Sequence, residues 1–189
     1  MRKLATPLLL ALLIPTLQGC FPVVAGGVGA GVVMATDRRT SGIYIEDQGI
    51  ELKAQSRTSD KLKDQAHLNI TSFNLSVLMT GEAQNEALRT EAENIVKTVP
   101  NVRQVFNEVT IGPNTPFSAR SNDSYITTKV KARMVDANKF NANHVKVVTE
   151  AGAVYLLGMV TRKESEEATE IARTTAGVVK VVKLFEYLD

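Results

Sequence analysis

The clearest pattern of apolar and polar positions lies in the second half of the chain. Three apolar residues recur there at helical spacing and predict a helix over residues 122–135, after N-cap candidates at 122–124: Ile126, Val130 and Met134. Residues 144–149 and 153–160 read as two strands on either side of the turn Glu150-Ala151-Gly152. This arrangement predicts a β-hairpin.

A second helix and a third strand follow the hairpin. Thr161 and Glu164 have the spacing of a capping box, in which each side chain accepts a hydrogen bond from a free backbone N–H of the helix start. The helix that follows places Ala168 and Ile171 on one face, and Gly177 ends it. Residues 178–187 are rich in β-branched residues and predict the last strand. The predicted order is α-β-β-α-β.

The first half of the chain repeats this order. His67-Leu68-Asn69-Ile70 corresponds to His144-Val145-Lys146-Val147, and Val77–Gly81 corresponds to Val154–Gly158 at the same offset. A repeat of this length indicates two domains of one fold. The elements predicted for the first copy are a helix over 47–58, strands over 67–72 and 75–80, a helix over 86–99 and a strand over 102–111. Two prolines and a glycine mark residues 112–121 as a linker between domains 47–111 and 122–189.

The N-terminus has the layout of a secretory signal over residues 1–19. A basic start, Met1-Arg2-Lys3, precedes an apolar run that is shorter than the roughly 20 residues of a membrane span and contains prolines. Leu17-Gln18-Gly19-Cys20 resembles the bacterial lipobox, which predicts that Cys20 is lipidated and becomes the mature N-terminus. Cys20 is the only cysteine, so no intramolecular disulfide forms. Phe21, in place of an aspartate, favours the outer membrane, facing the periplasm.

Residues 20–46 are predicted to connect the anchor to the first domain. Residues 21–36 are apolar and rich in glycine, so they form either a flexible tether or a segment that lies on lipid or on the body. Removal of the leader takes away Arg2 and Lys3, which leaves equal numbers of basic and acidic residues. The mature chain therefore has no global field that would attract nucleic acid. The absence of tryptophan and an aromatic content of 5% disfavour an aromatic-lined cleft for cell-wall polymers.

The repeated motifs resemble the BON domain. V-x-L-x-G stands at Val77–Gly81, with Met79 in the Leu position, and at Val154–Gly158. A-x-x-I and [GN]-V-x-x-V follow in both copies: Ala92, Ile95, Asn101, Val102 and Val105, then Ala168, Ile171, Gly177, Val178 and Val181. Two such domains behind a lipobox resemble the dual BON-domain outer-membrane lipoproteins of Gram-negative bacteria.

The resemblance implies an α+β fold in which each αββαβ domain places its helices on one face of a three-stranded sheet. It also implies a non-enzymatic protein without a cofactor. Such a protein binds anionic phospholipid through the first helix of its second domain and supports outer-membrane integrity. It is linked to division sites and to the outer-membrane protein assembly machinery.

The residues themselves fit a lipid-binding face on that helix. The side opposite the predicted core combines apolar and basic residues: Tyr125, Thr128, Lys129, Lys131, Ala132, Arg133 and Val135. Lysine stems can lie on apolar surface while their ammonium groups meet phosphates. Alternatively, this face packs on the first domain. Tyr125 replaces a tryptophan of the family pattern, which reduces the apolar area. The matching segment Gly49–Ser56 is less basic, so we expect no lipid binding by the first domain.

Other candidate chemistry is absent from the sequence. His67 and His144 occupy equivalent positions, which favours a structural role over a catalytic or metal-binding one. The acidic residues 164, 166, 167 and 170 are interpreted as a solvated helix face. The main alternative function is a periplasmic adaptor that recruits an envelope protein through the Tyr125 face or through sheet edges. Replacing Lys129 and Lys131 by glutamate separates the two, because lipid binding depends more strongly on charge and salt.

Overall fold

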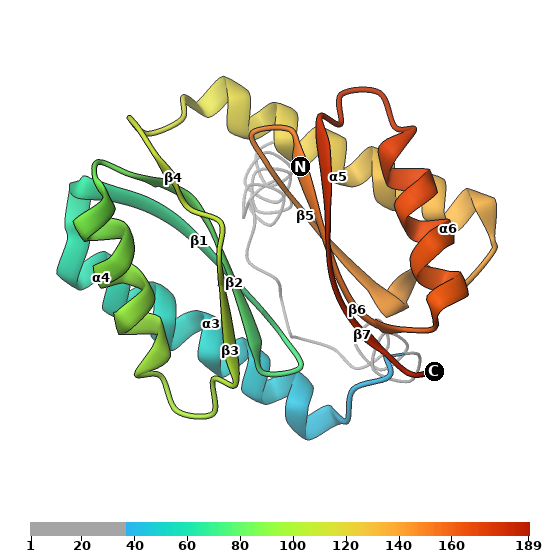
Figure 1. Cartoon of the computed structure of the whole chain (residues 1–189), viewed down its shortest axis with the longest axis horizontal. Helices are drawn as coiled ribbons and strands as arrows, with labels where there is room; N and C mark the ends of the chain where they lie inside the picture. Colours follow the sequence, from blue (N-terminus) through green and yellow to red (C-terminus); the bar gives the residue numbers. More distant parts are fainter. Residues whose placement is uncertain (1–36) are drawn as a thin grey trace, which may run out of the picture. The chain divides into compact units, whose positions relative to one another are not determined.

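Each half of the described chain contains an antiparallel β-hairpin and two helices (Figure 1). A further strand pairs in parallel with the second strand of the hairpin. The computed structural model describes residues 37–189. The first half contains α3 (Ser41–Leu62), a 3-10 turn (Lys63–Gln65), β1 (Ala66–Phe73), β2 (Ser76–Ala83), α4 (Glu86–Lys97), β3 (Gln104–Asn107) and β4 (Thr110–Ile111). The second contains α5 (Phe117–Ala137), a 3-10 turn (Ala142–His144), β5 (Val145–Glu150), β6 (Ala153–Val160), α6 (Arg162–Arg173) and β7 (Lys180–Tyr187).

The predicted α+β class and the αββαβ order are confirmed in both halves. The sheets have the strand orders β1-β2-β3 and β5-β6-β7, and β4 also pairs with β2. The strand predicted over 102–111 is interrupted, because the side chain of Asn107 accepts the backbone N–H of Val109 at 3.2 Å and Val109 is buried in the core. The capping box of α6 is present as predicted.

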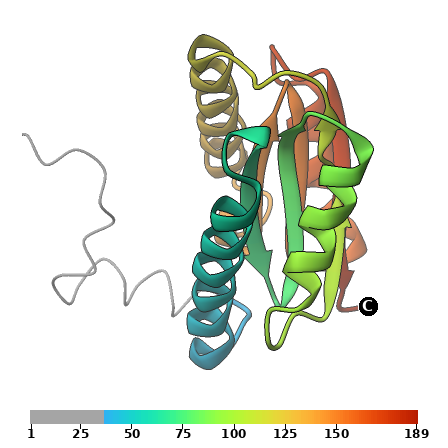
Figure 2. The ribbon, with the colours of Figure 1, turned by 90° about the vertical axis from the view of Figure 1, so that its left-hand side faces the viewer.

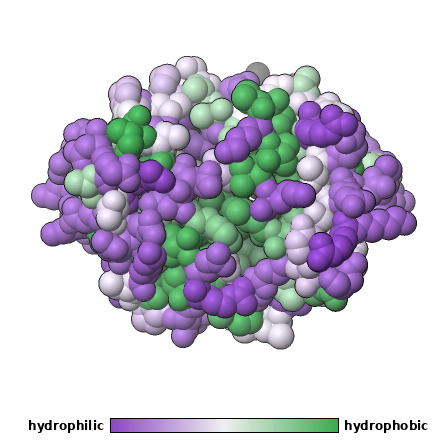
Figure 3. Space-filling model, in the orientation of Figure 1, coloured by the Kyte–Doolittle hydropathy of each residue, from purple (hydrophilic) through white to green (hydrophobic). Residues whose placement is uncertain are grey.

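Both faces of each central strand are buried. Val77 and Met79 of β2 pack in the helix-covered core of the first domain, whereas Leu78 belongs to a separate cluster with Tyr155 and Leu157 of β6. The two sheets therefore contact each other through the faces that their helices leave bare. Figure 3 shows apolar residues in the centre of one face, where the two halves meet. Burial on both sides explains why β2 and β6 read as continuous apolar runs rather than as an alternating pattern.

The glycine that ends each V-x-L-x-G motif is required by a close approach of two strands. A Cβ atom at Gly81 would lie 2.0 Å from the carbonyl oxygen of His67, and one at Gly158 would lie 2.4 Å from that of His144. Real Cβ atoms do not approach an oxygen so closely, so only glycine fits either site. In each domain, the backbone of the repeated histidine thus contacts the repeated glycine.

Two helices begin earlier than the sequence predicts. Ser41–Glu46, expected in the tether, form the first turns of α3, and Phe117–Ser121, expected in the linker, form the first turns of α5. The expected N-cap at residues 122–124 is therefore wrong. Asp123 lies inside α5 and is buried, and its carboxylate accepts the backbone N–H groups of Ala151 and Gly152 at 2.9 Å. The aspartate holds a hairpin turn instead of starting a helix.

Residues 37–39 bind both domains before α3 begins. The guanidinium of Arg38 donates to both carboxylate oxygens of Glu164, at 2.7 and 2.9 Å, and to the carbonyl of Met159 at 2.8 Å. Arg39 donates to the buried carboxylate of Asp47 at 2.7 Å. We call residues 37–39 the strap, because neighbouring residues of this segment contact the second and the first domain.

The contact between Arg38 of the strap and Glu164 leads us to expect that the folded protein loses stability in acid. Burial by itself raises the pKa of Glu164, but hydrogen bonds from Arg38, the Thr161 backbone and His144 outweigh it and lower that pKa from 4.5 to about 2. A carboxyl group with a depressed folded-state pKa stabilises the fold above its unfolded pKa, and this contribution disappears as the pH falls. We expect the free energy of unfolding to decrease between about pH 4.5 and 2, and Glu164→Gln to flatten this decrease. Chemical denaturation at several pH values measures it, and identical slopes would contradict the assignment.

Candidate functional site

Helix α5 carries most of the side chains that the sequence singled out. Its 21 residues span about 30 Å. Ile126, Val130 and Met134 are fully or almost fully buried against the second sheet, as the helical spacing predicts. The helix ends at Asn138, whose left-handed backbone (φ 48°, ψ 34°) stops the helical path. The opposite side of α5 is therefore fixed as an outward face.

Large apolar side chains are exposed along this outward face. Tyr125 and Val135 are 62% and 64% exposed, and the small residues Thr128 and Ala132 lie exposed between them. Phe117, in the first turn of α5, is 77% exposed and belongs to the same row. Phe117 was predicted to lie in the linker and was therefore not expected on this face. Its position two helical turns before Tyr125 was the available signal.

Two of the predicted basic residues have partners on the second domain. The Lys129 ammonium donates to the carbonyl of Ala176 at 2.9 Å and lies 5.3 Å from the centre of the Tyr125 ring. The Arg133 guanidinium donates to the carbonyl of Ile171 at 3.0 Å and to the hydroxyls of Thr174 and Thr175, where α6 ends. Arg133 thus satisfies carbonyl groups at a helix C-terminus, where a positive charge is favourable.

Lys131 differs from the other two cations. It has no hydrogen-bond or ion-pair partner among the described residues, although it lies on the exposed surface. Neighbouring atoms remove part of the water around its ammonium group and lower the pKa of Lys131, and the positive charge of Lys146 lowers it further. Lys146 in turn donates to Glu51 of α3 at 2.7 Å. The ammonium group of Lys131 is therefore available to an external anion.

The loop between α6 and β7 adds an exposed apolar residue that the sequence analysis missed. Val179 was predicted inside the last strand, but β7 begins at Lys180 and Val179 is exposed just before it. Its backbone N–H donates to the carbonyl of Gly152 at 2.9 Å. Lys129 connects this loop to α5 through the Ala176 carbonyl.

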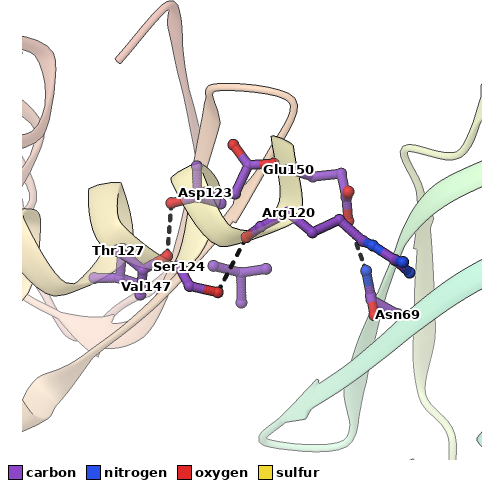
Figure 4. Close-up of a pocket in the computed structure, with 9 residues that line it drawn as sticks. Asn69, Arg120, Asp123, Ser124, Thr127, Val147 and Glu150 are labelled. Carbon is purple, nitrogen blue, oxygen red and sulfur yellow. Dashed lines mark hydrogen bonds between the residues drawn. The ribbon is translucent and has the colours of Figure 1, made fainter. Parts of the chain in front are cut away.

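The first turn of α5 is held by the first domain. Residues of α5, β1 and β5 together line a cavity of about 310 Å³, and Figure 4 shows side chains that line it. The Asn69 side chain donates to Glu150 at 2.8 Å across it, and Arg120 donates to the ring of His67 at 2.8 Å. These polar groups form hydrogen bonds with one another, so the residues around the cavity form a polar contact between the two domains. This contact, together with the hydrogen bonds of Lys129 and Arg133 to the second domain, fixes which face of α5 points outward.

The histidines and the acidic residues of the described chain form no metal site. Among residues 37–189, no group of three or more His, Cys, Asp or Glu side chains is arranged to hold a metal ion. His67 contacts Arg120 and His144 contacts Glu164, so both make structural contacts. No helix within the described part of the chain has the length and apolarity needed to span a bilayer. The predicted signal peptide, the lipidation site Cys20 and the apolar segment 21–36 lie outside the described residues.

Comparisons with known proteins agree with the repeat. The BON domain family profile matches residues 46–113 and 122–189. The chain is 38% identical over 175 residues to the outer membrane lipoprotein DolP of Haemophilus influenzae, covering 92% of this chain and 91% of that protein. It is 31% identical to the 21 kDa hemolysin of Actinobacillus pleuropneumoniae, covering 81% and 80%. It is 26% identical to the osmotically-inducible protein Y of Escherichia coli, covering 80% and 78%.

Proposed function

Because this chain belongs to the BON-domain family, with one domain in each half, we propose that it is a non-enzymatic outer-membrane lipoprotein whose second domain binds anionic phospholipid. In this proposal Cys20 carries the lipid anchor and the body faces the periplasm. The similarity to a protein named as an outer membrane lipoprotein supports this location. The lipid contact is the outward face of α5.

The observation that carries the proposal is the row of exposed apolar side chains on α5. Phe117, Tyr125 and Val135 are each more than 60% exposed, on a helix whose buried side is fully occupied by core residues. A solvated helix face does not need a phenylalanine, a tyrosine and a valine in one row. Aromatic and aliphatic side chains between short polar ones suit the boundary between lipid headgroups and acyl chains.

Charge supplies the preference for anionic lipid. Lys131 has no partner among residues 37–189, and the partners of Lys129 are a carbonyl oxygen and an aromatic ring, so neither charge is neutralised by a carboxylate. Each basic residue near an anionic membrane contributes about 1 kcal/mol. A few such contributions are enough for a protein that its own lipid anchor holds at the bilayer, because the second contact is then intramolecular.

The test is the binding of the polypeptide that starts at Phe21 to vesicles with and without phosphatidylglycerol. We expect binding to the anionic vesicles that weakens with salt, and weaker binding of Lys131→Glu. Reversing one charge removes about 2 kcal/mol, so the affinity should decrease roughly 30-fold. Lys131 has no partner in the described fold, so the substitution leaves the fold intact.

The matched control is Lys163→Glu, which makes the same change of net charge on α6. Lys163 is exposed and has no interaction partner in the described part of the chain. We expect its affinity for the vesicles to stay within about twofold of the wild type. Equal losses in both variants would mean that only net charge matters and would contradict a site on α5. Absence of binding by the folded wild-type protein would favour the adaptor function.

A further inference from the structure

Helix α3 of the first domain also exposes large aliphatic side chains. Ile45 is 63% exposed and Leu52 is 73% exposed, two helical turns apart and opposite the buried residues Ile50 and Ala54. Single exposed aliphatic residues are common on protein surfaces, so this pair alone carries no conclusion. The composition of the surrounding helix face is more informative.

The outward faces of the four helices differ in how many charges they carry. The residues around Ile45 and Leu52 are mostly small and uncharged over five turns of α3, and the exposed Lys53 and Asp60 lie beside this row: Ser41, Gln48, Gly49, Ser56 and Ser59. The outward row of α5 is likewise made of apolar and short polar residues, and Lys129 and Lys131 flank it: Phe117, Ser121, Ser124, Tyr125, Thr128, Ala132 and Val135. The outward faces of α4 and α6, by contrast, carry charges: Glu86, Lys97, Lys163, Glu166 and Glu170.

Helices α3 and α5 lie on one side of the body. Figure 2 shows α3 and α5 along the same side, with α4 set back from it. Lys146 of β5 connects them, since its ammonium donates to Glu51 of α3 at 2.7 Å and its charge also acts on Lys131 of α5. A flat partner on this side of the body would therefore face both helices.

The covalent path to the proposed anchor also reaches this side. The described chain begins at Asp37, immediately before α3, and Arg39 of the strap binds Asp47 inside α3. The chain between Cys20 and Asp37 spans roughly 60 Å at most. A lipidated Cys20 would thus keep α3 within reach of the bilayer surface.

We infer that α3 is a second membrane contact, so that the body rests on an anionic bilayer through the first helix of each domain, with Ile45 and Leu52 as the apolar residues of the first. This inference rests on the proposed lipid binding by α5. It reverses our expectation from sequence that the first domain does not bind lipid. That expectation rested on the low basic charge of Gly49–Ser56, whereas exposure of Ile45 and Leu52 is a property of the fold.

A polarity-sensitive fluorophore on a single cysteine tests the contact. The polypeptide that starts at Phe21 has no cysteine and contains the whole compact unit, so Leu52→Cys, Val135→Cys and Thr90→Cys each give one labelling site. On vesicles that contain phosphatidylglycerol and quencher-bearing acyl chains, we expect a blue shift and quenching at positions 52 and 135. Thr90, which is exposed on α4, should give neither.

The unlabelled variants Leu52→Glu and Thr90→Glu exclude an effect of the fluorophore. We expect Leu52→Glu to weaken vesicle binding about tenfold and Thr90→Glu to leave it within about twofold. A response at position 135 without one at 52, together with wild-type affinity of Leu52→Glu, would overturn the contact through α3 and leave the proposed function standing. Absence of vesicle binding by the wild type would overturn both.

Discussion

Replacing Asp47 by alanine is expected to lower the free energy of unfolding by about 3–5 kcal/mol. Its carboxylate is fully buried and accepts four hydrogen bonds, from the Arg39 guanidinium, the Ser72 hydroxyl and the backbone N–H groups of Asn74 and Leu75. Alanine would leave the two turn N–H groups without an acceptor. It would also remove the buried carboxylate that pairs with Arg39. The Arg39 guanidinium itself lies over the Phe73 ring, 4.1 Å from the ring centre.

The repeat offers the matched control Asp123→Ala. Asp123 occupies the equivalent position and is also buried, but it accepts only the two backbone N–H groups of the β5–β6 turn and has no arginine partner. Its replacement should cost about 1–3 kcal/mol, the usual cost of unsatisfied buried donors. Urea denaturation of both variants measures the difference. Equal losses would mean that the strap adds nothing to the stability of the first domain.

This pair of aspartates also shows where sequence reasoning reached its limit. The hairpins and the capping box were visible in the sequence, because each depends on residues close in sequence. The role of the aspartates was not visible, because the turns that they hold lie 27 to 29 residues away. Asp123 was read as an N-cap since aspartate is a favoured N-cap residue. The actual N-cap, Pro116, makes no side-chain cap.

The same limit applies to the residues of the candidate site. Helical spacing was sufficient to place Tyr125 and Val135 on the face away from the core, and the structure exposes both. Spacing could not reveal that Arg133 is bound at the end of α6 while Lys131 has no partner in the described fold, because that depends on where a distant helix ends. Exposure of Val179 likewise depends on the contact between its loop and the β5–β6 turn.

Tyr125→Glu is expected to weaken binding to phosphatidylglycerol vesicles about 100-fold. The substitution removes an aromatic ring that is 62% exposed in the free protein and therefore available to the bilayer. It also adds a negative charge that the anionic surface repels, and together these effects amount to about 3 kcal/mol. The new carboxylate would stand one helical turn before Lys129, so an ion pair would also neutralise part of the attractive charge.

The fold should tolerate this change, because the Tyr125 side chain contributes to no buried cluster and its nearest described partner is the Lys129 ammonium at 5.3 Å. Unchanged urea midpoints of Tyr125→Glu would confirm that a loss of binding is a surface effect. Tyr125→Phe keeps the ring and should bind within about threefold of the wild type, whereas Thr90→Glu adds the same charge on α4. If Tyr125→Glu bound as tightly as Thr90→Glu, the ring would make no contact with lipid, and an α5 face built on Tyr125 would fit a protein partner better than a membrane.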